Sequence, residues 1–486
     1  MASTPSTIDP IDWIETISSA DPQRPWLETP NGEFISYQVL HSAVRAMAAK
    51  LASAGIMPGD RIAACLEKSP EAVILYFACL WIGAIYMPLN TGYTQSEVAY
   101  FLQDAEPAIF VGDGIPHQTH SLADIATLPA APIAERPTFA PDAIAAMLYT
   151  SGTTGRPKGA MLTRANLASN AVALMNAWAI TADDVLIHAL PIFHVHGLFI
   201  AINSMTAAGA KMLFRAKFDP DDVIALMPRA TMLMGVPTFY TRLLSTPALT
   251  PEATATMRLF ISGSAPLLAE THRQFEARTG HAILERYGMT ETGINTSNPY
   301  EGARIAGTVG LPLPGVEVRI SDVVGDIGAI EVRGPNVFAG YWRNPEKTAA
   351  DFREGGWFIT GDLGKIDAQG YIHIIGRGKD LIITGGYNVY PKEVEDAIDA
   401  IPGVSESAVF GVPHHDFGEA VIAVVVGSGL DPSAILSQLR ERLAAYKLPK
   451  AIHIVDELPR NTMGKVQKTV LREGGVDWPH HACYQQ

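Results

Sequence analysis

Short apolar runs alternate with helix-length segments from the N-terminus to about Val309, and this alternation constrains the fold more than any other feature. A chain that returns through a helix after each strand builds a largely parallel sheet covered by helices. We therefore expect a class α/β fold of layered subdomains. The predicted buried strands are residues 61–65, 108–111, 185–190, 232–236 and 258–262, and the predicted helices include residues 37–54, 222–227 and 269–279.

The pattern changes after Val309. Residues 316–320, 329–332 and 371–375 are short alternating segments separated by Gly and Pro, which predicts an antiparallel, β-rich subdomain. Beyond residue 380 a compact tail has a strand–helix–strand rhythm, with strands at 380–384, 408–412 and 420–427 and helices at 391–400 and 435–445. At 486 residues the chain exceeds one ordinary core. We predict a large N-terminal domain (1–379) and a small α+β domain (380–486).

Composition excludes several classes of function. A net charge of −14 disfavours general nucleic-acid binding. The three cysteines (Cys65, Cys79, Cys483) lack CxxC spacing, and the N-terminus resembles neither a signal nor a transit peptide, so we expect a reducing, cytoplasmic setting. Residues 72–89 are uncharged for 18 positions, but Ser69-Pro70-Glu71 starts a helix and Gly83 stops it. This predicts a buried helix followed by a strand, and no membrane span.

Residues 148–159 follow an apolar strand and read Leu-Tyr-Thr-Ser-Gly-Thr-Thr-Gly-Arg-Pro-Lys-Gly. Glycines let backbone N–H groups face an anion, hydroxyls add donors, and Lys158 adds the charge that a polyphosphate requires. The P-loop of Walker-type NTPases needs Gly before the Lys and Ser or Thr after it, whereas this loop has Pro157 and Gly159. The loop predicts a phosphate cradle of another kind, with a flexible polar surface loop as the alternative.

Five motifs together resemble the adenylate-forming enzymes, the superfamily of acyl-CoA synthetases, peptide-synthetase adenylation domains and luciferases. They are residues 149–159, 287–291, 360–362, 376–380 and 459–465, in the order and approximate spacing of that superfamily. The resemblance spans essentially the whole chain. It implies ATP, Mg²⁺ and CoA as co-substrates and activator, with no tightly bound organic cofactor.

The resemblance also assigns residues to the nucleotide. Glu291 is expected to bind the Mg²⁺ carried on ATP, which suits a carboxylate beside phosphate, and Thr290 to contact the α-phosphate. Tyr287 is expected to stack on adenine. Asp362, expected at the end of a strand, and Arg377 are assigned to the ribose. The remaining expected ATP-binding residues are Thr150, Ser151, Gly152, Thr153, Thr154, Lys158, Ser264, Ala265, Pro266, Glu285 and Lys465.

Lys465 is the predicted catalytic lysine. Attack of a carboxylate on the α-phosphorus of ATP brings two anions together, and a lysine between them offsets the repulsion. The resemblance further implies a hinge at Lys379 or Asp380 that brings a second loop to the site. Gly385, Gly386 and Tyr387 of that loop are expected to line the path of CoA. Acylation of Lys465 would remove its charge and silence the first step.

Two histidines, His194 and His196, would share one face of an extended segment. A metal pair is an open reading, but no third ligand is evident. The resemblance instead implies that His194 lines the acyl pocket near the reacting carboxylate. The pairs at 414–415 and 480–481 are interpreted as loop and tail residues.

Arg286, directly before Tyr287, indicates which class of acid is the substrate. A buried arginine needs an anionic partner, and one carboxylate of the substrate must lie at phosphorus, so a second carboxylate would meet Arg286. Arg304 is a second candidate for that role, and Ile294 is expected to set room for a 2-methyl group. An ordinary ion pair of Arg286 with Glu285 or Asp362 is the structural alternative.

The residues around Arg286, at 385–390 and at 461–468 closely resemble malonyl-CoA synthetases. We therefore hypothesise a malonate–CoA ligase that also takes methylmalonate. The alternatives are a synthetase for medium-chain or aromatic monocarboxylates, a stand-alone enzyme that loads a carrier protein, and a non-catalytic nucleotide-binding relative. The expected partners are a small dicarboxylic acid, ATP and CoA, without nucleic acid.

Overall fold

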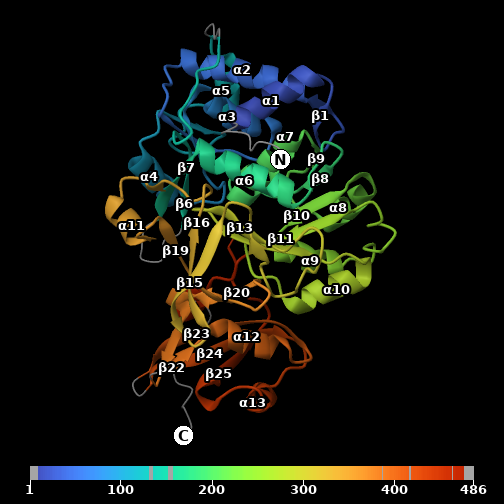
Figure 1. Ribbon diagram of the computed structural model, residues 1–486, viewed down its shortest axis with the longest axis vertical. Coiled ribbons are helices and arrows are strands. Elements are labelled where there is room, and N and C mark those ends of the chain that lie inside the picture. Colours follow the sequence, from blue (N-terminus) through green and yellow to red (C-terminus); the bar gives the residue numbers. More distant parts are fainter. Residues whose placement is uncertain are drawn as a thin grey trace. The chain divides into compact units, whose positions relative to one another are not determined.

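The chain divides into two compact units in a computed structural model that describes residues 9–130, 135–150, 157–385, 387–414, 417–461 and 464–474 (Figure 1). Unit 1 comprises residues 1–318 and 332–358, and unit 2 comprises residues 319–331 and 359–486. Each unit has its own hydrophobic core and is described by itself.

The largest sheet of unit 1 has nine strands and is parallel at its centre. Its edges are antiparallel, because β12 turns back into β13 and β1 into β2. In spatial order the strands are β14 (Leu311–Pro312), β13 (Gly293–Ser297), β12 (Leu284–Met289), β11 (Leu259–Ser262), β10 (Met232–Gly235), β8 (Val185–His188), β9 (Lys211–Phe214), β1 (Pro25–Glu28) and β2 (Phe34–Ser36). The parallel core confirms the predicted α/β class.

A second sheet of unit 1 has six strands and carries the ends of the predicted phosphate cradle. Four strands are parallel, while β7 and β17 are antiparallel to their neighbours. In spatial order the strands are β17 (Gly340–Tyr341), β7 (Lys158–Thr163), β6 (Ile144–Thr150), β4 (Ile85–Pro88), β3 (Arg61–Cys65) and β5 (Ile109–Gly112).

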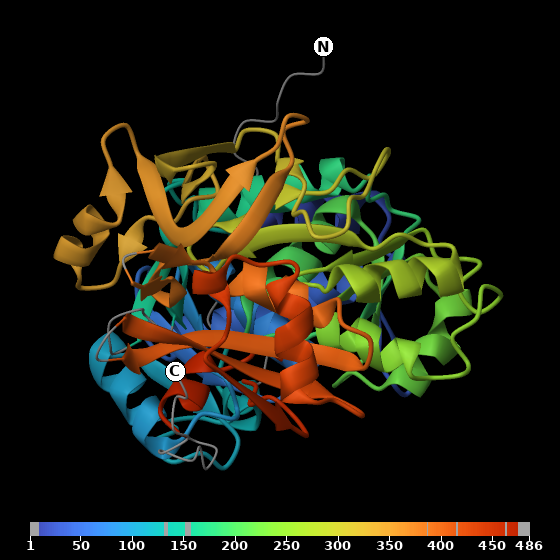
Figure 2. The same cartoon turned by 90° about the horizontal axis from the view of Figure 1, so that it is seen from below.

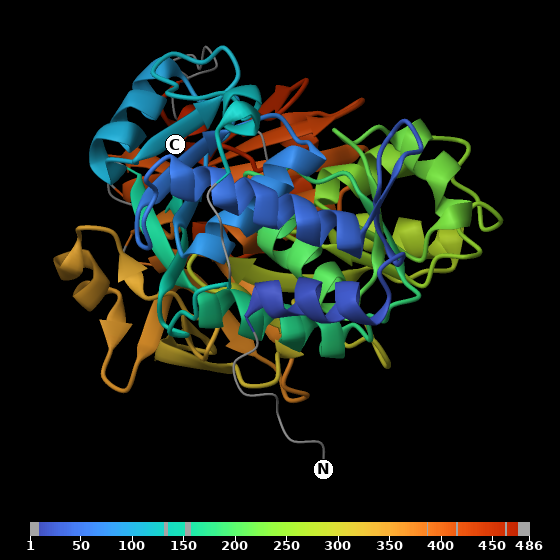
Figure 3. The same ribbon diagram turned by 90° about the horizontal axis from the view of Figure 1, so that it is seen from above.

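Helices cover both sheets. α8, α9 and α10 form one core with β8 to β11, and α1 and α2 lie side by side (Figures 1 and 3). The helices of unit 1 are α1 (Pro10–Ala20), α2 (Tyr37–Ser53), α3 (Pro70–Ile82), α4 (Gln95–Ala105), α5 (Leu122–Thr127), α6 (Arg164–Ala177), the π-helix η1 (His196–Ile202), α7 (Asn203–Ala208), α8 (Pro220–Leu226), η2 (Met227–Arg229), α9 (Pro237–Leu244), α10 (Ala269–Thr279) and α11 (Pro345–Ala350).

The uncharged stretch at 72–89 folds as predicted. Ser69 caps α3 by accepting a hydrogen bond from the Ala72 N–H, and Gly83 ends the helix at a φ of 76° before β4 begins. A side chain at Gly83 would also collide with the ring of Phe139. None of the described helices combines the length and hydropathy needed to cross a membrane.

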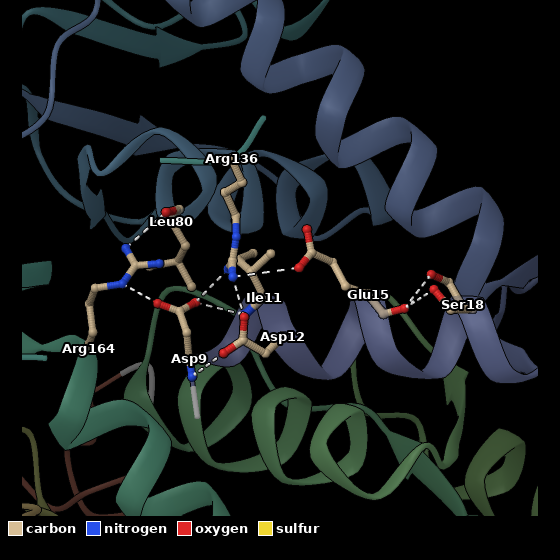
Figure 4. A network of polar contacts seen from close by, with 9 residues as sticks. Asp9, Ile11, Asp12, Glu15, Ser18, Leu80, Arg136 and Arg164 are labelled. Atoms are coloured by element: carbon tan, nitrogen blue, oxygen red, sulfur yellow. Dashed lines mark hydrogen bonds and ion pairs between the residues drawn. The ribbon is translucent and has the colours of Figure 1, made fainter. Parts of the chain in front are cut away.

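Helix α1 is tied to the rest of unit 1 by a cluster of charges (Figure 4). Asp9 caps α1 and pairs with both Arg136 and Arg164. Arg164 is the first residue of α6, and its guanidinium also donates to the carbonyl of Leu80 in α3, at 2.9 Å. The cluster therefore joins the starts of α1 and α6 to the end of α3.

Unit 2 contains a five-stranded sheet, with β22 (Tyr387–Val389), β21 (Ile382–Thr384), β24 (Gly418–Gly427) and β23 (Val404–His414) in order and β25 (Ala451–Val455) also beside β24. α12 (Pro391–Asp399) and α13 (Pro432–Arg440) pack against this sheet (Figure 2). η3 (Gly378–Asp380), η4 (Ala445–Lys447) and α14 (Lys468–Arg472) complete the unit. The predicted helix at 435–445 is wrong at both ends, because Pro432 begins the helix and its last residue is Arg440.

The antiparallel sheet predicted after Val309 is present and contains segments of both units. Its order is β15 (Glu317–Val324), β16 (Ile327–Arg333), β19 (Trp357–Ile366) and β18 (Phe352–Arg353), with β20 (Ile372–Arg377) also beside β19. β19 is longer than predicted, so Asp362 lies inside the strand and not at its end. The predicted boundary between residues 379 and 380 stays a prediction.

Candidate active site

The two strands that flank the predicted phosphate cradle are paired. Thr150 ends β6, Lys158 begins β7, and these two residues are partners in the antiparallel register. Tyr100 donates a hydrogen bond of 2.9 Å to the carbonyl of Pro157 and so holds the end of the loop. The predicted phosphate ligands Ser151, Gly152, Thr153 and Thr154 lie outside the described residues.

Lys158 is brought close to Glu291 by one aromatic residue, Tyr341. The ammonium of Lys158 lies 5.8 Å from the centroid of the Tyr341 ring, and the Tyr341 hydroxyl donates a hydrogen bond of 3.2 Å to Glu291 Oε1. The structure thus assembles the predicted phosphate lysine and the predicted Mg²⁺ ligand, although 133 residues separate them in sequence.

Thr290 and Glu291 lie in the tight turn between β12 and β13. Thr292 closes the turn by donating to the carbonyl of Met289 at 3.1 Å. Gly288 admits no side chain here, since a Cβ would lie 1.8 Å from the carbonyl oxygen of Gly293. The Glu291 carboxylate is buried and Thr290 is partly exposed, as is Tyr287 on β12.

Side chains from two other segments hold β13 in place. Asn170 of α6 accepts from the Ile294 N–H at 3.0 Å and donates to the Ile294 carbonyl at 2.8 Å. Asn336 donates to the carbonyl of Thr292 at 2.7 Å. Ile294 itself is buried. The buried amides of Asn170 and Asn336 therefore fix the backbone next to the turn that carries Thr290 and Glu291. A network of this kind is a rigid support for ligand-binding groups.

Arg286 lies on β12 with its guanidinium against Gly263, where an added Cβ would meet Arg286 Cζ at 2.4 Å. Only 5% of Arg286 is exposed, and its Nε and Nη2 have no hydrogen-bond partner among the described residues. Burial lowers the pKa of the Arg286 guanidinium to about 9. A cation in this state has free donors and no counter-charge, which is the condition for binding an anion.

The alternative of an ordinary ion pair does not hold for Glu285. Successive residues of a strand point to opposite faces, so Glu285 is directed away from Arg286. Its carboxylate contacts His272 at 3.4 Å and accepts from the Gly307 N–H at 3.2 Å. Asp362 pairs with Arg377, at 2.8 Å.

His196 lies near Arg286, and sequence reasoning did not assign it to the acid. His196 Nε2 is buried without a partner among the described residues, and His196 Nδ1 is 3.2 Å from the hydroxyl of Ser264. Burial, then the charge of Arg286, holds the pKa of His196 well below its usual value, so the imidazole is neutral. We call Arg286 and His196, both with unsatisfied donors, the polar pocket.

The extended His-x-His face expected for His194 and His196 is wrong. The Leu198 N–H donates to the His194 carbonyl at 3.0 Å, so the segment turns into the π-helix η1, which begins at His196. His194 Nδ1 accepts from the His196 N–H at 3.2 Å. The His-x-His spacing was the available signal for His196, but only the fold shows that it lies near Arg286.

Ser264, Ala265 and Pro266 form the turn after β11, as the motif predicts. Ser264 has a φ of 71°, which a residue with a side chain seldom adopts. Strain of this kind is concentrated at ligand sites. Arg304, the second candidate for the distal carboxylate, instead donates to three carbonyls, those of Ala282, Pro299 and Tyr300, at 2.8 to 3.3 Å. Arg304 therefore holds a loop, and Arg286 is left as the better candidate.

Unit 2 carries the predicted ribose ligands and the predicted hinge. Asp362 and Arg377 are register partners on β19 and β20, joined at 2.8 Å between Arg377 Nε and Asp362 Oδ1. Lys379 and Asp380 lie in the short helix η3, and Asp380 pairs with Arg472 at 3.4 Å.

Lys465 stands at the end of a turn that Arg460 and Asn461 brace. Asn461 and Lys465 exchange hydrogen bonds of 3.0 Å, and Arg460 donates to the Gly464 carbonyl at 2.6 Å while pairing with Glu406. Gly464 has a φ of 73°, which its lack of a side chain permits.

The loop predicted to meet CoA is partly described. Gly385 has a φ of 57°, and 59% of Tyr387 is exposed, with its ring stacked on Tyr446 at 4.7 Å between centroids. Gly386 lies outside the described residues.

The donor set suits a metal that arrives with the nucleotide. Across the described ranges no three His, Cys, Asp or Glu side chains converge. Mg²⁺ is ordinarily held by one or two carboxylates together with substrate phosphates and water, and the single buried carboxylate of Glu291 beside Lys158 fits that arrangement.

Known proteins resemble this chain over most of its length. A family model described as AMP-binding enzyme matches residues 15–342, and one described as AMP-binding enzyme C-terminal domain matches residues 393–465. The chain is 35% identical over 465 residues to the feruloyl-CoA synthase of an Amycolatopsis species, covering 91% of this chain and 94% of that one. It is 34% identical over 478 residues to the malonate–CoA ligase of Arabidopsis thaliana, covering 86% and 78% respectively.

One solved structure has a higher sequence identity to this chain than these two relatives. The crystal structure of ATP-bound MatB from Rhodopseudomonas palustris superposes with a TM-score of 0.92 at 54% sequence identity. The match covers 96% of this chain and 99% of that one.

Proposed function

The chain belongs to the AMP-binding enzyme family and is an ATP-dependent, AMP-forming acid–thiol ligase, and on this premise we propose that its acid is malonate. Malonate and ATP give malonyl-AMP and pyrophosphate, and CoA then gives malonyl-CoA and AMP. Methylmalonate is the second acid that we propose. The single observation that carries the proposal is the buried, unpaired guanidinium of Arg286.

A dicarboxylate is the acid that Arg286 favours. A buried charge without a partner is costly, and a monocarboxylate would leave Arg286 in that state after its own carboxylate had reached phosphorus. The second carboxylate of malonate would supply the missing counter-charge. A site built around unpaired polar groups rejects an analogue that cannot satisfy them by about 10⁴-fold.

The other member of the polar pocket supports the same end of the substrate. When Ser264 donates to His196 Nδ1, the imidazole carries its proton on Nε2 and can donate to a carboxylate oxygen. A neutral donor beside one cation suits a single carboxylate, which has room for about four hydrogen bonds. We also propose that His194 and Ile294 border this pocket, with Ile294 setting room for a 2-methyl group.

We assign the phosphates of ATP to four residues, Lys158, Thr150, Thr290 and Glu291. A carboxylate oxygen of malonate attacks the α-phosphorus, the bond to the bridging oxygen of the β-phosphate breaks, and pyrophosphate leaves. Mg²⁺ bound with ATP supplies charge neutralisation during that displacement. Lys158 and the loop before it would hold the leaving pyrophosphate, and Thr290 would contact the α-phosphate.

The remaining roles rest on the family resemblance. Ser264, Ala265, Pro266, Glu285 and Tyr287 would surround adenine, and Asp362 with Arg377 would hold the ribose. Lys465 would bridge the incoming carboxylate and the α-phosphate. In the second step the thiol sulfur of CoA attacks the carbonyl carbon, its proton is lost and AMP leaves, with Gly385, Gly386 and Tyr387 along the path of CoA and Lys379 or Asp380 as the hinge.

An aromatic or medium-chain monocarboxylate is the alternative to a dicarboxylate. The 35% identity to a feruloyl-CoA synthase favours it. Loading of a carrier protein in place of CoA is a further alternative, which turnover with free CoA would exclude.

ATP- and CoA-dependent AMP formation with malonate, methylmalonate, acetate, octanoate and benzoate separates the candidates. We expect malonate to give the highest kcat/KM, and Arg286→Ala to abolish that preference. Arg304→Gln is the matched control, because the hydrogen bonds of Arg304 among the described residues go to backbone carbonyls, and it should leave the order of acids unchanged. Preference for a monoacid that persists in Arg286→Ala would refute the malonate proposal.

A further inference from the structure

Tyr341 occupies a position between the phosphate cradle and the predicted metal ligand. It lies on β17 and pairs in antiparallel register with Ala160 of β7, two residues beyond Lys158. Only 7% of Tyr341 is exposed. Its hydroxyl reaches Glu291 Oε1 at 3.2 Å, while the Lys158 ammonium lies 5.8 Å from the centre of its ring. One side chain therefore contacts both groups.

The surroundings fix Tyr341 in this place. Its N–H donates to the Thr348 hydroxyl at 2.9 Å, and a side chain at Gly340 would meet Thr348 Cγ2 at 2.7 Å, so β17 and α11 are closely packed. The ring of Phe338 meets that of Tyr341 edge to face at 4.8 Å. The Phe338 N–H also donates to the Glu291 carbonyl at 2.8 Å. Tyr341 and Glu291 are thus held in one rigid group through both backbone and side chains.

We propose that Tyr341 is a positioning residue for the nucleotide: its hydroxyl orients the Glu291 carboxylate for the metal on ATP, and its ring aligns the Lys158 ammonium with the phosphates. This inference rests on the proposed roles of Glu291 and Lys158. A hydrogen bond to one carboxylate oxygen restricts rotation about the terminal bond, which fixes the direction of the other oxygen. A cation over an aromatic face is attracted to it, which limits the positions of a flexible lysine.

Tyr341→Phe tests the hydroxyl alone, because the ring, its contact with Phe338 and its approach to Lys158 are retained. The readout is binding of a fluorescent ATP analogue titrated with Mg²⁺, without acid or CoA, so that no turnover is measured. We expect the Mg²⁺ concentration at half-maximal binding to rise about 10- to 100-fold, which is the usual effect of losing a hydrogen bond to a metal ligand. Binding without Mg²⁺ should not change.

Tyr341→Leu removes the ring as well, and should also weaken binding of the analogue at saturating Mg²⁺. Tyr37→Phe is the matched control, because it deletes a buried hydroxyl that donates to the Ala210 carbonyl at 3.0 Å, in another part of unit 1. Its Mg²⁺ midpoint should equal that of the unmodified enzyme, even where its melting temperature falls.

An unchanged Mg²⁺ midpoint in folded Tyr341→Phe would overturn the inference. Glu291→Gln separates this failure from a failure of the premise. If Glu291→Gln loses Mg²⁺-dependent binding and Tyr341→Phe does not, the role of Tyr341 alone is refuted. If Glu291→Gln also binds normally, Glu291 is not the metal ligand, and both the assignment and the inference built on it are refuted.

Discussion

Two arginines of the nine-stranded sheet show how differently one residue type is used. Arg258, just before β11, donates from Nε and Nη2 to both oxygens of Asp184 at 2.7 Å and also reaches the carbonyls of Trp178 and Ala179 at 3.1 Å. Arg286, on the adjacent β12, leaves Nε and Nη2 without a partner among the described residues. Burial alone would lower the pKa of both, but Asp184 raises that of Arg258.

The difference separates a structural arginine from a binding one. Arg258 has carboxylate and carbonyl acceptors on all three nitrogens, so the fold uses it to connect β11 to the loop before β8. Arg286 lacks such acceptors for Nε and Nη2 among the described residues, and Nε2 of the neighbouring His196 is also unsatisfied. Evolved structures rarely leave buried polar groups unpaired, and such a group in a native fold usually has a ligand or a functional role.

The largest expected effect is on activity. Arg286→Met should lower kcat/KM for malonate by about 10³-fold, because the second carboxylate loses a buried charge-assisted contact. The free energy of unfolding should stay constant or rise, because an unpaired buried charge is replaced by an apolar side chain of similar length. Initial rates and urea unfolding measure the two quantities. A parallel loss of stability and activity would mean that Arg286 is structural.

Arg258→Met should show the opposite behaviour. Removing one partner of a buried ion pair leaves Asp184 uncompensated, which costs about 3–5 kcal/mol of unfolding free energy. The order of preference among the acids should not change, since Arg258 is saturated by the protein. Urea unfolding measures the free energy, and kcat/KM for the panel of acids measures the preference. An altered acid preference in a folded Arg258→Met enzyme would contradict the distinction between Arg258 and Arg286.

A smaller effect is expected for the carboxylate Asp399 in unit 2. Burial raises its pKa to about 7, with Glu395 and Asp396 adding to the rise, and one of its oxygens has no partner among the described residues. The folded chain then holds this proton more tightly than the unfolded chain between about pH 4 and 7, so the contribution of Asp399 to stability is fully present below about pH 4 and is lost as the pH rises to about 7.

Asp399→Asn should remove this fall. The gain at pH 7.5 should be about 2 kcal/mol, after discounting the full shift for the residual exposure of the side chain. Urea unfolding at pH 4.5 and pH 7.5, for the unmodified enzyme and the variant, measures the change. Asp184, whose pKa is lowered below 3.8 in spite of burial because Arg258 binds it, loses its contribution to stability only at lower pH and should add no slope between these two values. Equal pH slopes for the Asp399→Asn variant and the unmodified enzyme would contradict the assignment.

Local signals were sufficient for most of the fold. The predicted strand at 61–65 and the predicted helix at 269–279 coincide with β3 and α10, because hydrophobic period and caps are local properties. The bounds of β19 were missed because Gly361 continues through a positive φ of 75° where a strand was expected to end. The π-helix at 196–202 has no sequence period of its own, and was also missed.

The site was predicted less completely, since its contacts join distant segments. Arg286 could be singled out because it stands directly before Tyr287 in a recognised motif. Its lack of partners among the described residues, and the approach of His196, depend on how β11, β12 and η1 pack. Tyr341 lies 50 residues beyond Glu291 and carries no local signal for their hydrogen bond. Arg304 had a plausible charge, but only the structure shows its three carbonyl partners.

The central claim is that Arg286 is kept unpaired for a second carboxylate. The most direct test is the ratio of kcat/KM for malonate to that for monomethyl malonate, which keeps the skeleton and one carboxylate but lacks the second charge. We predict a ratio above about 10³ for the unmodified enzyme and a ratio near one for Arg286→Met. A ratio near one in the unmodified enzyme would contradict the account.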